Sequence, residues 1–398
     1  MDAYIIDGIR TPIGSYQGAL AAVRPDDLGA LVIKTLVEKN TQIPPSAYDD
    51  VIMGCANQAG EDNRNVARMS LLLAGLPYTV PGETVNRLCS SGLSAIIHAN
   101  RAIKAGDGHV FIAGGIENMT RGPLVVSKPS SAFGTDSKMY DSSFGWRFVN
   151  PKMHALYGTD AMGETAENLV DHYTISRQDQ DAFALHSQQK ASAAQASGRL
   201  GQEIVPVEIP QRKGEAIQFS KDEFIKPATS MEGLAKLRPA FKKDGTITAA
   251  SSSSINDGAA AMVLMRQSTA TKLGCKPLAR IVSHATHAQA PEWFATAPVG
   301  ATQKALAKAG WQVNDVDLWE VNEAFAVVPM ALMKELNVSH DKVNVNGGAC
   351  ALGHPIGASG ARIIVTLMHA LKAKGLKKGL ATLCIGGGEG TAMAIELM

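Results

Sequence analysis

Two regions of the chain repeat the same order of secondary structure, and this repetition constrains the fold more than any other feature. The periodicity of the apolar residues predicts each element. The first copy comprises helix 28–37, strand 51–54, helix 93–103 and strand 109–113, and the second comprises helix 300–308, strand 318–321, helix 361–373 and strand 380–385. The copies are offset by roughly 270 residues, which indicates a duplicated unit.

Strands that alternate with helices predict an α/β fold with a largely parallel sheet. Two similar halves are expected to pack as pseudo-symmetric partners, so a site between them receives equivalent loops from each. This geometry predicts that Cys89 faces its counterpart region, residues 346–360, across a shared cleft. A duplication that is only architectural stays open as the alternative.

The stretch between the two copies has a different character. The chain has 398 residues, for which two to three domains are expected. Residues 119–247 are polar and irregular, with helices expected over 163–172 and 177–197 and a strand over 204–209. This stretch is too long for a plain loop, so we interpret it as an insertion folded as its own lobe.

Composition excludes several classes of function. The chain is 45% hydrophobic and 19% charged, with a net charge of +1 and 5% aromatic residues. It has neither the basic block nor the stacking residues of a nucleic-acid binder, and no apolar run long enough to span a membrane. Its five cysteines form no C-x-x-C pair, and we see no targeting signal, so the cytoplasm is the expected compartment.

Cys89 is the first candidate for chemistry. It stands between an extended approach and the helical run that ends at Gly106, and is therefore expected at a helix N-terminus. Unpaired N–H groups and the helix dipole there favour the thiolate, so we expect the thiol pKa below its usual value of about 8.5. The alternative is a buried structural cysteine.

Three other stretches supply polar groups for the expected cleft. In residues 346–360, glycines frame His354, a candidate base for Cys89. Cys384 ends an apolar strand before a glycine turn that begins at Gly386, where backbone N–H groups can form an oxyanion hole. Asn322 and Glu323 follow the strand over 318–321, where either side chain could instead cap a helix.

Other motifs carry less weight. Residues 347–360 lack the G-K-[ST] of a phosphate loop and the G-x-G-x-x-G spacing of a dinucleotide fold. His284 and His287 lie close together without a carboxylate cluster, so we expect no metal site there.

Taken together, four stretches resemble the signature motifs of the thiolase family. They are residues 86–92, 322–325, 353–357 and 384–388, with the sequences NRLCSSG, NEAF, GHPIG and CIGGG. The resemblance covers essentially the whole chain, including RTPIG at 10–14 and NDG at 256–258.

The resemblance implies a fold and an activity. The fold is a duplicated, five-layered αβαβα sandwich with an N-terminal core half (1–118 plus 248–272), a loop domain that binds coenzyme A (119–247) and a C-terminal core half (273–398). The activity is that of an acetyl-CoA C-acyltransferase in lipid metabolism, such as fatty acid β-oxidation, which reversibly cleaves acetoacetyl-CoA or a longer 3-oxoacyl-CoA. Coenzyme A is a co-substrate, no cofactor or metal is permanently bound, and the assembly is a homotetramer built from dimers.

The resemblance also implies roles for individual residues. Cys89 attacks the 3-keto carbon after His354 takes its proton, and Cys384 protonates the departing acetyl-CoA enolate. Asn322, through a water, and His354 hold one thioester oxygen, while the N–H groups of Cys89 and Gly386 hold the other. The implied contacts on the coenzyme A side are Met162, Phe241, Ala249, Ser253, Phe294, Ala324 and Phe325.

The resemblance leaves the substrate open. Short-chain biosynthetic thiolases carry a histidine before the methionine at 162, where this chain has Ala161. Residues 60–65 and 145–150 are more similar to degradative and 3-oxoadipyl-CoA thiolases, and 322–328 to acetoacetyl-CoA thiolases. A 3-oxoadipyl-CoA thiolase of aromatic degradation is therefore an alternative, as is a catalytically silent acyl-CoA or lipid-binding module. A ketoacyl synthase is less favoured, because it usually places a second histidine where this chain has Cys384.

Overall fold

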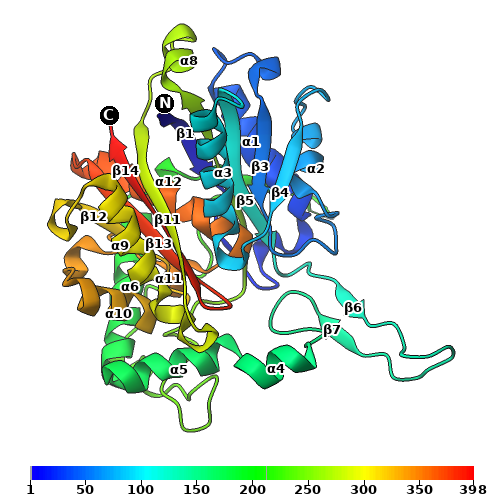
Figure 1. Ribbon diagram of the computed structural model, residues 1–398, viewed down its shortest axis with the longest axis vertical. Helices are drawn as coiled ribbons and strands as arrows, with labels where there is room; N and C mark the ends of the chain where they lie inside the picture. The colour runs from blue at the N-terminus through cyan, green and yellow to red at the C-terminus, as the bar shows by residue number, and fades with distance from the viewer. Residues whose placement is uncertain (1, 212) are drawn as a thin grey trace.

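The large sheet of the protein is built from two halves that meet at its middle. A computed structural model describes residues 2–211 and 213–398 (Figure 1). In sheet order the strands are β12 (Leu318–Val321), β13 (Lys378–Ile385), β14 (Glu389–Leu397), β11 (Ala279–Ala288), β1 (Ala3–Arg10), β10 (Asn256–Arg266), β5 (Val110–Asn118), β3 (Asp50–Gly54) and β4 (Gly82–Val85), and β2 (Gly14–Ser15) pairs with β10.

This strand order confirms the predicted duplication. Outward from the middle, the order β1, β10, β5, β3 on one side corresponds to β11, β14, β13, β12 on the other. The two halves join through a short antiparallel ladder, in which Tyr4 pairs with Arg280 and Ile5 with Ala279.

The expectation of a largely parallel sheet is wrong. Only β3–β4, β3–β5 and β12–β13 are parallel in the large sheet. β14 follows β13 directly through the turn at Gly386, and β10 enters between β1 and β5 after the insertion. Neither strand arrives through a crossover helix, so both pair antiparallel with their neighbours.

Helices lie in three layers around the two sheet halves. α1 (Pro25–Lys39) and α2 (Val66–Leu73) pack on the outer face of one half, and α9 (Ala297–Ala309) and α10 (Val327–Leu336) on the outer face of the other. α3 (Ser91–Ala105) and α12 (Ile356–Lys374) pack together between them. The predicted αβαβα sandwich is therefore the observed fold.

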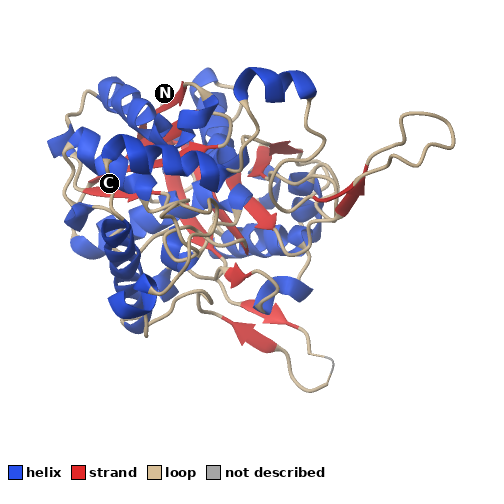
Figure 2. Cartoon of the chain, turned by 90° about the horizontal axis from the view of Figure 1, so that it is seen from below, coloured by secondary structure: helices blue, strands red, loops and turns tan. Residues whose placement is uncertain are grey.

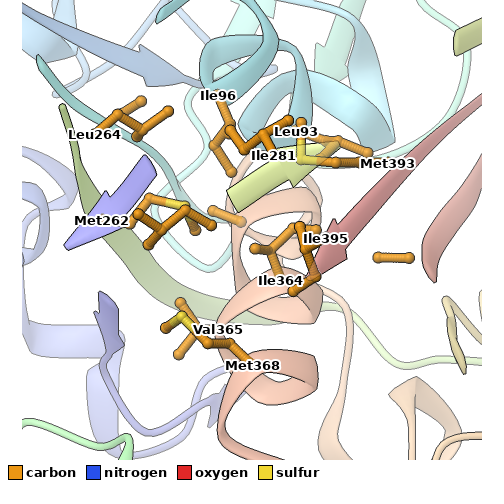
Figure 3. Close-up of a cluster of buried hydrophobic side chains, with 14 of the residues drawn as sticks. Leu93, Ile96, Met262, Leu264, Ile281, Ile364, Val365, Met368, Met393 and Ile395 are labelled. Atoms are coloured by element: carbon orange, nitrogen blue, oxygen red, sulfur yellow. The ribbon is translucent and has the colours of Figure 1, made fainter. Parts of the chain in front are cut away.

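The central core belongs to both halves. Figure 3 shows Leu93 and Ile96 of α3 and Ile364 of α12 gathered with Met262 of β10 and Ile395 of β14. All five side chains are buried. Because this cluster takes apolar side chains from both halves, burying it fixes how the halves pack.

Several predicted elements differ in extent from the observed ones. α1 begins at Pro25, before its predicted start at residue 28. β5 continues through the glycines at 114 and 115 to Asn118 instead of ending at residue 113. A glycine inside a strand lets another backbone segment approach closely, and Gly115 does this for Gly357.

The described residues of the segment 119–247, which are 119–211 and 213–247, contribute no strand to the large sheet. Their elements are β6 (Leu124–Val126), β7 (Met139–Asp141), α4 (Pro151–Tyr157), α5 (Met162–Tyr173), α6 (Arg177–Ala196), β8 (Val207–Ile209), β9 (Ile217–Phe219) and α7 (Met231–Ala235). α5 and α6 are the two predicted helices, whereas the strand expected over 204–209 is only β8. Figures 1 and 2 show the β6–β7 hairpin projecting from the body of the molecule.

A buried ion network ties this segment to the core. Arg10 is fully buried, with its Nε 2.7 Å from Glu203 Oε1 and its Nη1 2.7 Å from Asp222 Oδ1. Breaking one member leaves an uncompensated buried charge, which costs about 3–5 kcal/mol. The motif at 10–14 thus supports the architecture.

No helix within the described ranges is long and apolar enough to cross a membrane.

Candidate active site

One cavity of about 720 Å³ contains the predicted reactive side chains. Cys89, His354 and Cys384 all line it, although they come from three distant parts of the chain. The rest of its wall is contributed by residues 119–247 and by the two core halves. The predicted cleft between Cys89 and the region 346–360 is therefore present.

Cys89 sits on a strained turn at the start of a helix, as predicted. It lies in the 3-10 turn η3 (Leu88–Ser90), directly before α3. Leu88 has a φ of 46°, which an L-residue rarely adopts. The turn is held by Asn86 Oδ1, which accepts from Leu88 N at 2.9 Å, and by Ser91 Oγ, which accepts from Arg87 N at 2.9 Å. These bonds hold the Cys89 backbone in one conformation.

Glycines let the starts of α3 and α12 touch. A Cβ on Gly92 would lie 2.7 Å from the carbonyl oxygen of Gly357, and one on Gly360 would lie 2.3 Å from the nitrogen of Leu93. A Cβ on Gly115 of β5 would lie 1.9 Å from the Gly357 oxygen. Only glycine permits this approach, which brings Cys89 and His354 to one cavity.

His354 is held as a neutral imidazole with one free nitrogen. Its Nδ1 lies 2.5 Å from Ser359 Oγ, which donates its own hydrogen to the oxygen of Pro355 at 2.9 Å. The tautomer in which Nδ1–H donates to this hydroxyl satisfies both hydrogen bonds at once. Nε2 is buried with no hydrogen-bond partner among the described residues. Burial lowers the pKa of His354 to about 3, so Nε2 carries a lone pair at neutral pH.

The pKa expected for Cys89 is wrong for the resting protein. Desolvation raises the pKa of the Cys89 thiol to about 11, although the residue is only partly buried and lines the cavity. The N–H groups of Gly386 and of Cys89 itself act in the opposite direction, but their effect is smaller than that of desolvation. Cys89 is therefore a thiol at neutral pH, and it requires a base.

Cys384 lies at the end of β13, close enough to Cys89 for the two thiols to interact. Burial raises the pKa of Cys384 well above the ordinary value, and a charge on Cys89 raises it further. The turn after Cys384 approaches the same place, since a Cβ on Gly386 would lie 3.3 Å from Leu88 Cδ1 and 3.4 Å from Met162 Sδ. Cys384 is thus a protonated acid beside a second thiol.

Asn322 and Glu323 have different environments. Asn322 is fully buried, and neither its Nδ2 nor its Oδ1 has a hydrogen-bond partner within the described part of the chain. Glu323 accepts from Ser187 Oγ at 2.7 Å, Asn344 Nδ2 at 2.7 Å and Cys350 N at 3.0 Å. Glu323 therefore joins three segments, while the orphaned amide of Asn322 calls for a partner such as water. Neither Asn322 nor Gly386 lines the cavity itself.

All seven residues predicted to contact coenzyme A line the cavity, namely Met162, Phe241, Ala249, Ser253, Phe294, Ala324 and Phe325. Three of them form an aromatic cluster, in which Phe325 meets Phe241 at 5.6 Å and Phe294 at 6.3 Å, edge to face. Ser253 N donates to Ala324 O at 2.9 Å, which links the segment before β10 to the one after β12.

Sequence reasoning missed other residues of the wall, including Met119, Phe144, Gln188, Lys226, Cys350 and Ile356. Ile356 lies within the recognised GHPIG motif at 353–357, so a signal was available for it, whereas Met119 follows β5 directly and belongs to no recognised motif. Lys226 and Phe144 lie in irregular stretches without a periodic pattern, where the sequence carries no comparable signal.

Around the histidines at 284 and 287, as elsewhere in the described ranges, no group of three or more His, Cys, Asp or Glu side chains is placed to hold an ion. Burial lowers the pKa of His284 to about 4. His287 Nδ1 contacts Lys304 Nζ at 3.0 Å.

Comparison with known proteins identifies the family. Residues 3–268 match the family model for the thiolase N-terminal domain, and residues 275–397 match the model for the C-terminal domain. The chain belongs to the thiolase family. It is therefore an acyltransferase.

Proteins similar to this thiolase include beta-ketoadipyl-CoA thiolases and acetyl-CoA acetyltransferases. It is 51% identical to the beta-ketoadipyl-CoA thiolase of Pseudomonas putida over 397 residues, which cover 99% of each chain. It is also 51% identical to the acetyl-CoA acetyltransferase of Chromobacterium violaceum, over the full length of both chains. The crystal structure of the Bacillus anthracis acetyl-CoA acetyltransferase matches with a TM-score of 0.93 at 41% identity, covering 100% of this chain and 99% of that one.

Proposed function

We propose that this thiolase cleaves 3-oxoadipyl-CoA with coenzyme A, giving acetyl-CoA and succinyl-CoA, through an acyl group held on Cys89. The observation that carries the mechanism is that Cys89, His354 and Cys384 line one cavity. The substrate is supported by relatives at 50–51% identity, among them the 3-oxoadipyl-CoA/3-oxo-5,6-dehydrosuberyl-CoA thiolase of Escherichia coli.

The first half-reaction forms the acyl-enzyme. Nε2 of His354 takes the thiol proton as Cys89 sulfur attacks the 3-keto carbon, and the bond between carbons 2 and 3 then breaks. The electron pair of that bond goes to the enolate of acetyl-CoA, which takes a proton at carbon 2 from Cys384. Cys384 is left as a thiolate and Cys89 carries the acyl group.

The second half-reaction releases the acyl group. The thiolate of Cys384 takes the proton of the incoming coenzyme A thiol, whose sulfur attacks the acyl carbon. Cys89 leaves as a thiolate and recovers its proton from the His354 imidazolium. Cys89 and Cys384 are then protonated thiols and His354 is a neutral imidazole. These are the resting states that the raised thiol pKa values and the lowered imidazole pKa indicate.

Two sets of donors stabilise the oxyanions. The N–H groups of Cys89 and Gly386 hold the oxygen on the carbon that Cys89 attacks, which agrees with their effect on the thiol pKa. Protonated His354 and a water on the orphaned amide of Asn322 hold the thioester oxygen of the enolate. Hydrogen-bond donors therefore stabilise the negative charge that develops on both sides of the breaking carbon–carbon bond in the transition state.

Residues 119–247, as a loop domain between the two core halves, contribute to coenzyme A binding. Met162 and Phe241 from this segment pack against Phe294 and Phe325 from the C-terminal half and form an apolar part of the cavity wall. An apolar wall of this kind suits the pantetheine arm, which must lie extended to bring its sulfur to Cys89.

Acetoacetyl-CoA is the second candidate substrate. Two similar proteins, from Chromobacterium violaceum and Bacillus anthracis, are named acetyl-CoA acetyltransferases. Longer straight-chain 3-oxoacyl-CoAs, the substrates of fatty acid β-oxidation, are a third class for the same test.

The test is a substrate panel. Purified enzyme is given coenzyme A with 3-oxoadipyl-CoA, acetoacetyl-CoA or a long-chain 3-oxoacyl-CoA, and loss of the 3-oxoacyl absorbance is followed. The proposal predicts the highest kcat/KM for 3-oxoadipyl-CoA. A higher value for acetoacetyl-CoA assigns the enzyme to the second candidate, and no decay with any substrate leaves only a binding module.

We also propose that the enzyme is a cytoplasmic homotetramer. The hairpin formed by β6 and β7 exposes large apolar side chains, including Leu124, Phe133 and Met139, which a second copy would cover. All five cysteines are free thiols, as expected in a reducing compartment. Sedimentation of the wild type against a variant with these three residues changed to serine tests the assembly.

A further inference from the structure

We propose that Glu117 is a positioning residue, whose carboxylate fixes the start of α12, and with it His354, against the end of β5 beside Cys89. The proposal rests on the function proposed above, but it concerns a residue to which the mechanism gives no role. Glu117 is 3% exposed and lies one residue before the end of β5.

The two oxygens of Glu117 bind backbone groups of two separate segments. Oε2 accepts from Gly357 N at 2.9 Å and from Ala56 N at 2.8 Å. Oε1 accepts from Asn57 N at 3.0 Å and lies 3.6 Å from Cys55 Sγ. Gly357 is the second residue of α12, so the carboxylate caps that helix and ties it to the loop that follows β3.

The bond between Glu117 and Gly357 affects His354 because the short loop that carries His354 is also held at its other end. His354 N donates to Asn256 Oδ1 at 2.9 Å, and Asn256 Nδ2 donates to Gly14 O at 2.9 Å. His354 therefore lies between two fixed points, Asn256 before it and Glu117 on Gly357 after it. Releasing one of them frees one end of a short loop.

Glu117 also acts on Cys89 through its charge. Burial raises the pKa of Glu117 to about 7, and the three N–H groups that it accepts oppose this shift. Its negative charge is one of the causes that raise the pKa of Cys89. The titratable groups that face Glu117 are Cys55, Asp62 and Cys89. Removing the charge should therefore lower the pKa of the Cys89 thiol.

The test separates position from charge with two variants. Glu117→Gln removes the charge and turns an N–H₂ group toward backbone donors, whereas Glu117→Asp keeps the charge but is too short to reach all of its partners. We expect kcat to fall about 10- to 100-fold in both variants with KM nearly unchanged, because the base is displaced. The rate of Cys89 alkylation by iodoacetamide is measured from pH 6 to pH 11 in each, and its midpoint should move to lower pH by up to about one unit in the Gln variant only.

The matched control is Asp49→Asn. Asp49 also accepts two backbone bonds, from His109 N at 2.7 Å and Val110 N at 2.9 Å, but at the opposite end of β5 from the cavity. Neither kcat nor the alkylation midpoint should change in it. An unchanged kcat in both Glu117 variants, or a kcat lowered equally by Asp49→Asn, would overturn the proposal. The alkylation profile requires no turnover, so it still tests Glu117 if the proposed reaction is wrong.

Discussion

Nδ1 of His354 lies 2.5 Å from Oγ of Ser359, one turn along the helix that His354 precedes. Together with the bond from Ser359 Oγ to Pro355 O, this contact favours the imidazole tautomer with its lone pair on Nε2. Ser359→Ala should therefore lower kcat about 10- to 100-fold with little change in KM, and Ser359→Thr should restore most of it. Steady-state kinetics measures both.

A matched serine elsewhere provides the control for that prediction. Ser70 is also fully buried, and its Oγ donates to Asp26 O at 2.9 Å, away from the cavity. Ser70→Ala should cost about 1 kcal/mol of stability and leave kcat unchanged. If Ser359→Ala also left kcat unchanged, Ser359 would have no part in setting the tautomer.

Replacing Cys384 by alanine should separate the two halves of the reaction. Without the acid, carbon–carbon cleavage is expected to slow by about 10²- to 10⁴-fold. Acetylation of Cys89 by acetyl-CoA needs no protonation at carbon 2, and its leaving group is the thiolate of coenzyme A, which can depart without a proton from Cys384. Radiolabelled acetyl-CoA should therefore still label the variant. Cys275→Ala, which changes a buried cysteine outside the cavity, should retain both activities. Loss of labelling together with cleavage would mean that Cys384 has another role.

The neutral, buried His354 should make the protein sensitive to acid. Its pKa is lowered to about 3 in the folded protein, from an ordinary value near 6.5. Between these two pH values the unfolded chain binds the extra proton, so the free energy of unfolding should fall as pH falls from about 6.5 toward 3. His354→Gln removes this contribution, and urea unfolding at pH 7 and pH 5 should show a smaller loss in the variant. An equal loss would contradict a buried neutral imidazole.

Gly92→Ala should disrupt the contact between the two central helices. Its Cβ would lie 2.7 Å from Gly357 O and 2.9 Å from Ala361 N, both of which are backbone atoms. We expect the helices to separate, with a lower melting temperature and a large loss of kcat, since overpacking costs about 1–3 kcal/mol. Gly201→Ala, where a Cβ meets nothing within 4 Å, should change neither. A fully active Gly92→Ala enzyme would argue against this contact as the device that positions Cys89.

The sequence predicted the duplication, the layers and the residues of the cavity more closely than it predicted the pairing of the strands or the state of the nucleophile. Duplication is visible because helix and strand periodicities repeat locally. The places of β10 and β14 depend on contacts between distant segments, so local periodicity suggested a parallel sheet. The same limit applies to Cys89, where the helix N-terminus was apparent in the sequence but the burial that raises the thiol pKa was not.

Two glycines led to a wrong prediction of where a strand ends. The glycines at 114 and 115 suggested the end of a strand, whereas β5 continues through them. At Gly115 the missing side chain makes room for Gly357, which is more than 200 residues away in the chain. A glycine selected for a long-range approach and one selected for a turn look alike in a single sequence.

The most direct measurement of the central claim is to identify where the acyl group is held. Enzyme mixed with 3-oxoadipyl-CoA in the absence of coenzyme A is quenched with acid, digested and examined by peptide mass spectrometry. The proposed mechanism predicts a succinyl group on Cys89, with one acetyl-CoA released per acylated site. A succinyl group on Cys384, or release of acetyl-CoA with no acylated cysteine at any time, would contradict it.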